Sequence, residues 1–202
     1  MAVVTEHIVK TGEHQTFYLA AGPKAGPTVI LCHGWPELSI SWRHQLQCLG
    51  DLGFHAIAPD MRGYGRSTVY PRHEDYALMH TVGDMIGLAD ALGIERAVWI
   101  GHDWGAPVVW SIASHHPTRC HAVANLCVPY ATLERGYEAC LPLLDRSVYP
   151  VDEYPFGQWD YQVFYEEDFA RAIQPMDANP TNAIKVVSRK GMPEMRGKVW
   201  RA

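Results

Sequence analysis

The chain has 202 residues, of which 48% are hydrophobic and 19% charged, and this composition excludes extended disorder and suffices for a packed core. Its 17 basic and 22 acidic residues give a net charge of −5, which argues against a nucleic-acid partner, because phosphate binding requires a basic face. No apolar run is long enough to cross a bilayer, and the first residues lack a signal-peptide pattern. We therefore expect a cytoplasmic protein with no membrane partner.

The cysteines predict free thiols rather than a disulfide framework. Their number is odd, no C-x-x-C pair occurs, and most lie in apolar segments: Cys32, Cys48, Cys120, Cys127 and Cys140. We therefore expect buried, reduced thiols, as in a reducing compartment.

The first part of the chain predicts strands that alternate with helices. A hairpin is expected from two strands at 7–11 and 15–22. Further strands are predicted at 28–34, 54–60, 95–101 and 120–128, and helices at 39–53, 76–93 and 104–117. This alternation predicts an α/β fold, in which right-handed crossovers build a mostly parallel sheet with helices on both faces.

The composition changes after Pro129. Proline, tyrosine and acidic residues become frequent, and no strong strand pattern follows. We therefore expect an α/β core over 1–129 and a helical cap, or lid, over 130–202. The last residues, 188–202, show no clear periodicity, and no element is predicted there.

Three polar motifs directly follow predicted strands. They are "HGWPE" at 33–37, "DMRGYGRS" at 60–67 and "GHDWGA" at 101–106. Because ligands of parallel sheets bind at the carboxyl ends of the strands, we expect the three turns to converge on one edge of the sheet.

Asp103 stands at the tip of a tight strand-to-helix turn, where many hydrolases place a serine. The small residues Gly101, Gly105 and Ala106 leave room for an exposed side chain. The structural alternative is that Asp103 only caps the helix that follows. The motif context favours a nucleophile, and the helix N-terminus favours its negative charge.

Two other patterns predict no site. The segment "GYGRST" at 63–68 lacks the third glycine of a dinucleotide-binding loop and does not lead directly into a helix. His115 and His116 are adjacent on a predicted helix and point about 100° apart, so they do not predict a metal site.

Together with "WDYQVFY" at 159–165, these motifs make the chain resemble the α/β hydrolases, specifically the epoxide hydrolases, from about residue 5 to about residue 170. The resemblance implies that Asp103 attacks an epoxide carbon and forms an ester that water then opens to a vicinal diol. The backbone N–H groups of Trp104 and Trp35 are then expected to stabilise the negative charge on the ester oxygen. No metal or cofactor is implied.

The resemblance also predicts residues around a small hydrophobic epoxide substrate. His33, Gly34, Pro36 and Trp104 are expected to border it, with His33 orienting its loop rather than acting as a base. The bond between Trp35 and Pro36 is a candidate for the cis form. Tyr161 matches a lid tyrosine that donates a hydrogen bond to the epoxide oxygen, whereas no position matches the second lid tyrosine of the family.

The chain departs from the family where water must be activated. That step needs a histidine and an acid after later strands, and no histidine follows His121. The expectation is a chain truncated before its C-terminal acid and histidine. The missing strands would expose a sheet edge through which the chain could form a homodimer.

Two other functions stay open. A haloalkane dehalogenase would use the same aspartate to displace halide, although Trp35 and "WDYQ" favour an epoxide. A non-catalytic α/β-hydrolase-like protein that binds small hydrophobic ligands would explain the absent histidine and acid, whereas the intact Asp103 motif argues against it.

Overall fold

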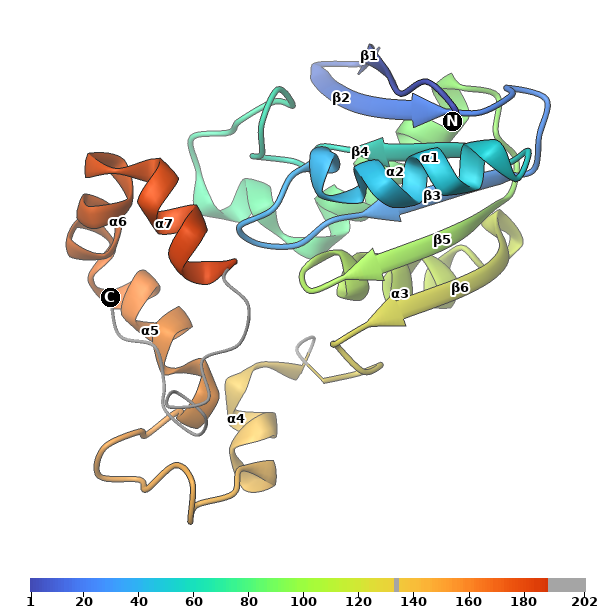
Figure 1. Ribbon diagram of the computed structural model, residues 1–202. Helices are drawn as coiled ribbons and strands as arrows, with labels where there is room; N and C mark the ends of the chain where they lie inside the picture. The colour runs from blue at the N-terminus through green and yellow to red at the C-terminus, as the bar shows by residue number, and fades with distance from the viewer. Residues whose placement is uncertain (133–134, 189–202) are drawn as a thin grey trace. The chain divides into compact units, whose positions relative to one another are not determined.

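The computed structural model describes residues 1–132 and 135–188 (Figure 1). Contacts within the chain divide it into two compact units, Met1–Ala131 and Thr132–Ala202. We call them the first and the second unit. Residues 189–202 of the expected cap lie outside the described residues.

The first unit is built on one mixed sheet. Its strands are β1 (Thr5–Thr11), β2 (His14–Ala21), β3 (Thr28–Cys32), β4 (His55–Pro59), β5 (Ala97–His102) and β6 (Cys120–Leu126). Within the described residues their order is β1-β2-β4-β3-β5-β6, with β4, β3, β5 and β6 parallel and the β1–β2 hairpin antiparallel. The predicted α/β architecture, mostly parallel with a hairpin at its start, is confirmed.

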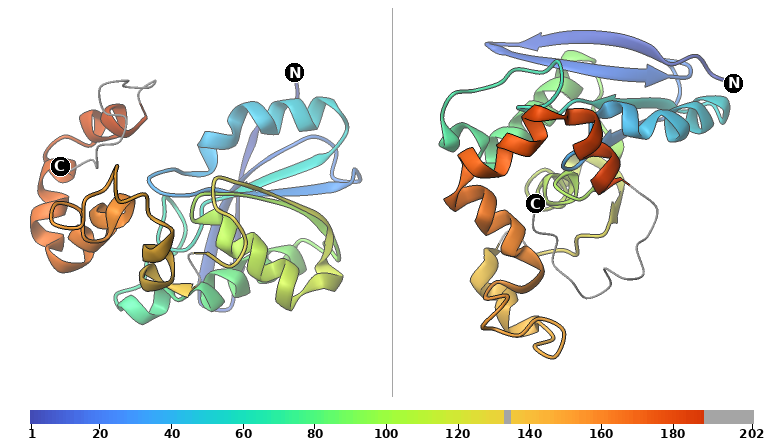
Figure 2. Two further views of the ribbon diagram at one scale, coloured as in Figure 1. Left: turned by 90° about the horizontal axis from the view of Figure 1, so that it is seen from below. Right: turned by 60° about the vertical axis from the view of Figure 1, so that its left-hand side comes forward.

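Helices cover both faces of this sheet. They are α1 (Arg43–Asp51), α2 (Leu78–Ala91) and α3 (Gly105–His115). Figure 2 shows α1 on one face and α2 and α3 on the other. Side chains along each strand alternate between the two faces. In β3, Val29 and Leu31 pack with Leu46 of α1, while Ile30 and Cys32 belong to the apolar cluster on the opposite face.

All three predicted helices of the first unit are shorter than expected, and two of them begin two or more residues late. The segment 39–53 begins as a 3-10 helix, Ser39–Trp42, and becomes α-helical only at Arg43. The Ser39 amide donates a hydrogen bond of 2.9 Å to the Asp60 carboxylate. The segment 76–93 is helical from Leu78, because Ala77 has the extended ψ of 141°.

The strand order creates the place for a site. From β3 the chain crosses to β4 on one side, and it later returns to β5 on the other side of β3. The turns that follow β3 and β5 therefore leave neighbouring strands in different directions, which is the arrangement that opens a crevice at the carboxyl ends of parallel strands.

The second unit is helical in its described residues. Its helices are α4 (Tyr137–Cys140), α5 (Asp160–Glu167), α6 (Phe169–Ala178) and α7 (Pro180–Val187). Pro180 occupies the first turn of α7, and the Asn179 side chain accepts a hydrogen bond from the Asn182 amide at 3.0 Å, so this start is fixed by an ordinary cap. In the described part of the chain, no helix combines the length and the apolar character needed to cross a membrane.

The prediction that the cysteines are buried is only partly right. All five are free thiols, and Cys32 and Cys140 are buried, but Cys48 and Cys127 are exposed. Cys48 lies two positions after the buried Leu46, which turns it to the outer face of α1. Cys127 follows the edge strand β6. An apolar neighbourhood in sequence was therefore a poor guide to burial.

Candidate active site

The turn between β5 and α3 places Asp103 in a strained backbone conformation. Its φ is 51°, in the left-handed region that few residues other than glycine, asparagine and aspartate adopt. The turn is tight, since a Cβ at Gly101 would collide with Gly105 and a Cβ at Gly105 would collide with the backbone of Cys32. Such strain is typical of a functional position.

The carboxylate of Asp103 faces the turn that follows β3. The Trp35 amide donates a hydrogen bond of 2.8 Å to Asp103 Oδ1. A Cβ at Gly34 would collide with the Asp103 side chain, so only glycine permits this approach. The bond between Trp35 and Pro36 is cis, as the sequence suggested.

The structure does not support the alternative in which Asp103 only caps the helix. The residue before the first helical position of α3 is Trp104, and no side chain caps this helix. Asp103 contributes its backbone carbonyl instead, which accepts from the Ala106 amide at 2.9 Å. Its carboxylate therefore takes no part in capping α3.

Of the two amides expected to form the oxyanion hole, the Trp35 N–H is hydrogen-bonded to the carboxylate, at 2.8 Å. Its role as an oxyanion donor stays a prediction. Across residues 1–132 and 135–188, no hydrogen bond joins the Trp104 amide to Asp103, so its role stays a prediction. The Trp104 side chain is 42% exposed.

His33 holds the loop after β3 against the loop after β4. Its side chain is completely buried, Nε2 accepts from the Met61 amide at 3.0 Å, and Nδ1 therefore carries the proton that it donates to the Gly34 carbonyl at 2.8 Å. Burial lowers the pKa of His33, which favours this neutral form. This geometry fits an orienting residue, and direct contact with a substrate stays a prediction for His33, Gly34 and Pro36.

A pair that the sequence analysis missed joins the turns after β5 and β3. His102 is the last residue of β5. In the structure His102 Nδ1 lies 3.2 Å from Glu37 Oε2, which links the turn after β5 to the turn after β3. Nothing local in the sequence indicates this pairing, because the two residues are 65 positions apart.

Tyr64 is a further residue that the sequence analysis missed. It packs edge-on against His33, with ring centroids 4.8 Å apart. Burial, and secondarily the negative charge of Asp103, raise its pKa to about 12. Tyr64 and Trp104 also line a cavity of about 310 Å³ with Met61, Arg62, His73, Tyr76, Leu78, Thr81 and Val108. The sequence signal for Tyr64 was the motif at 60–67. The sequence analysis recognised this motif but predicted none of its residues to belong to the site.

Tyr161 belongs to the second unit, where it lies in the first turn of α5. Its hydroxyl accepts a hydrogen bond from Gln162 Nε2 at 2.8 Å, and its ring packs edge-on with that of Tyr165 at 6.0 Å. Burial, and then Tyr161, raise the pKa of Tyr165 to about 12. The approach of Tyr161 to Asp103 stays a prediction.

Comparison with known proteins gives consistent matches. The family model described as "alpha/beta hydrolase fold" matches residues 27–179. Epoxide hydrolase A of Mycobacterium tuberculosis is 48% identical over 129 residues, covering 64% of this chain and 40% of that protein. An epoxide hydrolase of Caballeronia sordidicola is 46% identical over 134 residues, covering 66% and 40%. The chain thus spans about 40% of the length of these relatives.

Solved structures agree with the sequence matches. A crystal structure of an epoxide hydrolase from Vigna radiata aligns with a TM-score of 0.75 at 30% identity, covering 92% of this chain and 55% of that chain. Epoxide hydrolase A from Mycobacterium thermoresistibile aligns with a TM-score of 0.66 at 38% identity, covering 86% and 55%. With the family match over most of its length and a mostly parallel sheet flanked by helices, the chain belongs to the α/β-hydrolase fold family.

Proposed function

We propose that the chain carries the ester-forming machinery of an epoxide hydrolase, with Asp103 as nucleophile. The observation that carries the proposal is the Asp103 carboxylate, presented at a φ of 51° with Oδ1 bound by the Trp35 amide. That hydrogen bond leaves Oδ2 as the attacking atom. The epoxide hydrolases among the relatives support an epoxide as the substrate.

In the first step Oδ2 attacks an epoxide carbon from the side opposite the ring oxygen. A new C–O bond forms, the ring C–O bond breaks, and its electron pair passes to the ring oxygen. We assign the proton for that oxygen to the hydroxyl of Tyr161. A carboxylate suits this step because it yields an ester that water can cleave, whereas a serine would yield a stable ether.

In the second step water adds to the ester carbonyl and the negative charge moves to Oδ1. The Trp35 N–H already lies at 2.8 Å from that atom, so the donor is in place before the charge develops. This step also needs a base. His33 is buried and engaged by the backbone at both nitrogens, and His102 pairs with Glu37, so we give neither the task.

The test is the intact mass of the purified, folded 202-residue chain after incubation with styrene oxide. We expect a gain of one whole epoxide, located on Asp103 by peptide mapping. Asp103→Asn keeps a residue that tolerates positive φ and is expected to give no adduct. Asp152→Asn, an exposed acid of the second unit, is the matched control and is expected to label as the parent does.

The outcomes separate the remaining functions. Diol formation without a lasting adduct would mean that a base completes the reaction in this chain. No adduct and no diol would refute the catalytic proposal and leave a ligand-binding member of the family. Release of halide from a short haloalkane, without reaction with the epoxide, would favour a dehalogenase.

Two further features remain proposals. A cytoplasmic location is supported by five free thiols. A homodimer through β6 is supported by its position at the edge of the sheet and by Leu126, which is 46% exposed. Light scattering would test the dimer, with Ala124→Lys on the edge strand expected to give a monomer.

A further inference from the structure

A second cavity lies at the opposite end of the parallel strands from Asp103. Its volume is about 800 Å³, within the range of small-molecule sites. Thr28 and His55, the first residues of β3 and β4, line it, and so does Arg96, which directly precedes β5. Asp103 follows the other end of β5, so this cavity is separate from the candidate active site.

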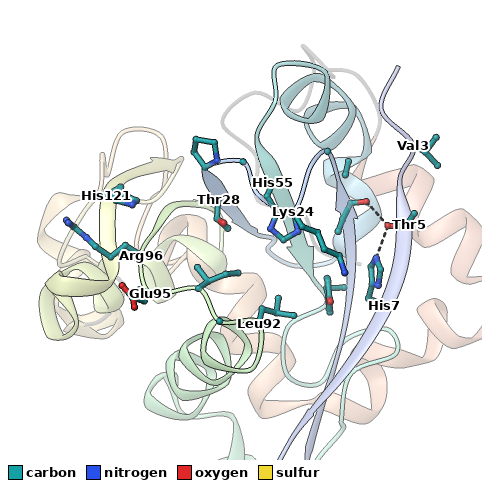
Figure 3. A pocket seen from close by; sticks show the side chains of 18 residues that line it. Val3, Thr5, His7, Lys24, Thr28, His55, Leu92, Glu95, Arg96 and His121 are labelled. Atoms are coloured by element: carbon teal, nitrogen blue, oxygen red, sulfur yellow. Dashed lines mark hydrogen bonds between the residues drawn. The ribbon is translucent and has the colours of Figure 1, made fainter.

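Cationic and titratable side chains predominate around this cavity. Two fixed positive charges, Lys24 and Arg96, are joined by three histidines, His7, His55 and His121 (Figure 3). Glu95 is the single carboxylate among the lining residues that the structure describes.

The two fixed charges are not neutralised by ion pairs. Within residues 1–132 and 135–188 neither Lys24 nor Arg96 forms a salt bridge, and Arg96 Nη2 donates only to the Cys120 carbonyl, at 2.8 Å. Lys24 extends toward His7 in Figure 3. The ammonium is therefore free to pair with an anion.

His7, beside Lys24, is held in place by two contacts. His7 Nε2 lies 2.7 Å from Thr5 Oγ1, and the His7 ring stacks on Tyr18 at 5.0 Å. His55 is half-buried, and its pKa is lowered first by burial and then by the positive charges of Lys24 and His7. A positive potential thus acts on this part of the cavity, and an anion would relieve it.

The rest of the lining is largely apolar. Ala20, Leu92 and Ile94 belong to it, together with the ring of Tyr18. An inorganic ion alone would leave this surface unused, whereas an organic anion would cover it with its apolar part. Among the described residues, no group of three or more histidines, cysteines and acids could hold a metal ion, so the histidines do not indicate a metal site.

We propose that this cavity binds a small organic anion, a carboxylate or phosphate monoester on an apolar body, whose charged group pairs with Lys24, His7 and His55. The shared chemistry of the two classes is an anionic oxygen group that accepts charge-assisted hydrogen bonds. The site is independent of the epoxide chemistry and requires no reaction.

The test is to titrate the 202-residue chain separately with phenyl phosphate, benzoate and benzyl alcohol. Binding is measured by calorimetry and by the NMR signals of the histidine rings. We expect saturable 1:1 binding of at least one of the two anions, with shifts of His7 and His55. Comparing phenyl phosphate with benzoate identifies the anionic group that is preferred. Benzyl alcohol, which keeps the ring without the charge, is expected to bind at least tenfold more weakly.

Matched variants locate the binding. Lys24→Met is expected to weaken binding about tenfold or more, and Lys24→Arg to retain it. Lys10→Met removes the same charge from β1 at a position that does not line the cavity, and its affinity should stay within twofold of the parent. Absence of saturable binding, equal losses in the two Met variants, or benzyl alcohol binding as tightly as the anions would each overturn the proposal.

Discussion

The first unit (Met1–Ala131) encloses its sheet between two clusters of buried apolar side chains, whereas the second unit (Thr132–Ala202) buries few side chains in its described part. Leu46 and Trp99 of the first unit are inaccessible or nearly so. In the second unit, Leu143 is 76% exposed and Phe169 is 63% exposed. The first unit is therefore stabilised by its own interior, and the second depends much less on internal burial.

This difference suits the chemistry that we propose. A nucleophile and its oxyanion donor must be held to within a fraction of an ångström, and rigid strands achieve that better than loosely packed helices. A unit whose proposed part is one hydrogen-bond donor to the substrate can be less rigid. The predictions below contrast residues of the two units, compare two tyrosines within the second unit, or probe the interior of the first.

The largest expected effect comes from a buried ion pair. Arg62 donates two hydrogen bonds of 2.7 Å to Asp84, which is 6% exposed. Asp84→Ala leaves the guanidinium without its partner and should lower the free energy of unfolding by about 3–5 kcal/mol. In the second unit Asp168→Ala removes an exposed partner of Arg171 and should change the free energy of unfolding by less than about 0.5 kcal/mol. Urea denaturation measures both, and equal losses would contradict the comparison.

The next largest effect on stability is expected from truncating a buried apolar side chain. Leu46→Ala empties a site between α1 and the sheet and should cost about 2–5 kcal/mol. Leu143→Ala makes the same change at an exposed position and should cost less than about 0.5 kcal/mol. The shift of the urea midpoint measures the loss of stability in each variant. A large loss of stability in Leu143→Ala would mean that the second unit has a core of its own at this residue.

The third effect concerns rate rather than stability. If Tyr161 donates to the ring oxygen, Tyr161→Phe should slow formation of the Asp103 ester about 100-fold without lowering stability. Tyr149→Phe, another tyrosine of the second unit, is the control. Adduct mass followed over time measures the rate, and equal rates in the two variants would remove Tyr161 from the mechanism.

A smaller effect follows from the buried histidines. Burial lowers the pKa of His33 below its value in the unfolded chain, so the unfolded chain binds the proton more readily. The neutral His33 therefore makes its full contribution to the free energy of unfolding above a pH of about 6.5. That contribution decreases as the pH falls from there toward the lowered pKa of His33 in the native chain. Unfolding measured from pH 7.5 to 5 should show this loss. His33→Gln should flatten the slope, with His14, whose pKa burial also lowers, supplying part of what remains.

The smallest change is chemical labelling, which leaves stability untouched. Burial raises the pKa of Cys32 to about 12, so at pH 8 it carries almost no thiolate. An aromatic disulfide reagent should modify the exposed Cys48 and Cys127 in the native chain and reach Cys32 only in urea. Peptide mapping identifies the sites, and labelling of native Cys32 would indicate an opening of the first unit.

Local patterns predicted most of the first unit. The apolar runs placed the strands, and the small residues around Asp103 predicted the tight turn that the structure shows. These features depend on neighbours in sequence, since a turn or an alternation is complete within a few residues. The same reasoning erred where one residue decides a boundary, as at Ala77 before α2.

The contacts that assemble the site could not be predicted in this way. Trp35 and Asp103 are 68 positions apart, and Glu37 and His102 are 65 apart. Tyr64 acquires its raised pKa only from burial and from the charge that folding brings near it. Convergence at one sheet edge was predictable from topology, whereas the individual hydrogen bonds depend on side-chain positions that no local pattern encodes.

The hydrogen bond between Trp35 and Asp103 also has a consequence for how the chain matures. Its 68-residue separation makes it a late contact in folding, since closing a long loop loses entropy before the bond can compensate. The turn after β3 cannot meet its partner until β5 has been added to the sheet. During synthesis, therefore, the nascent chain cannot hold the proposed nucleophile in this geometry until residues beyond Asp103 have emerged and the central sheet has been assembled.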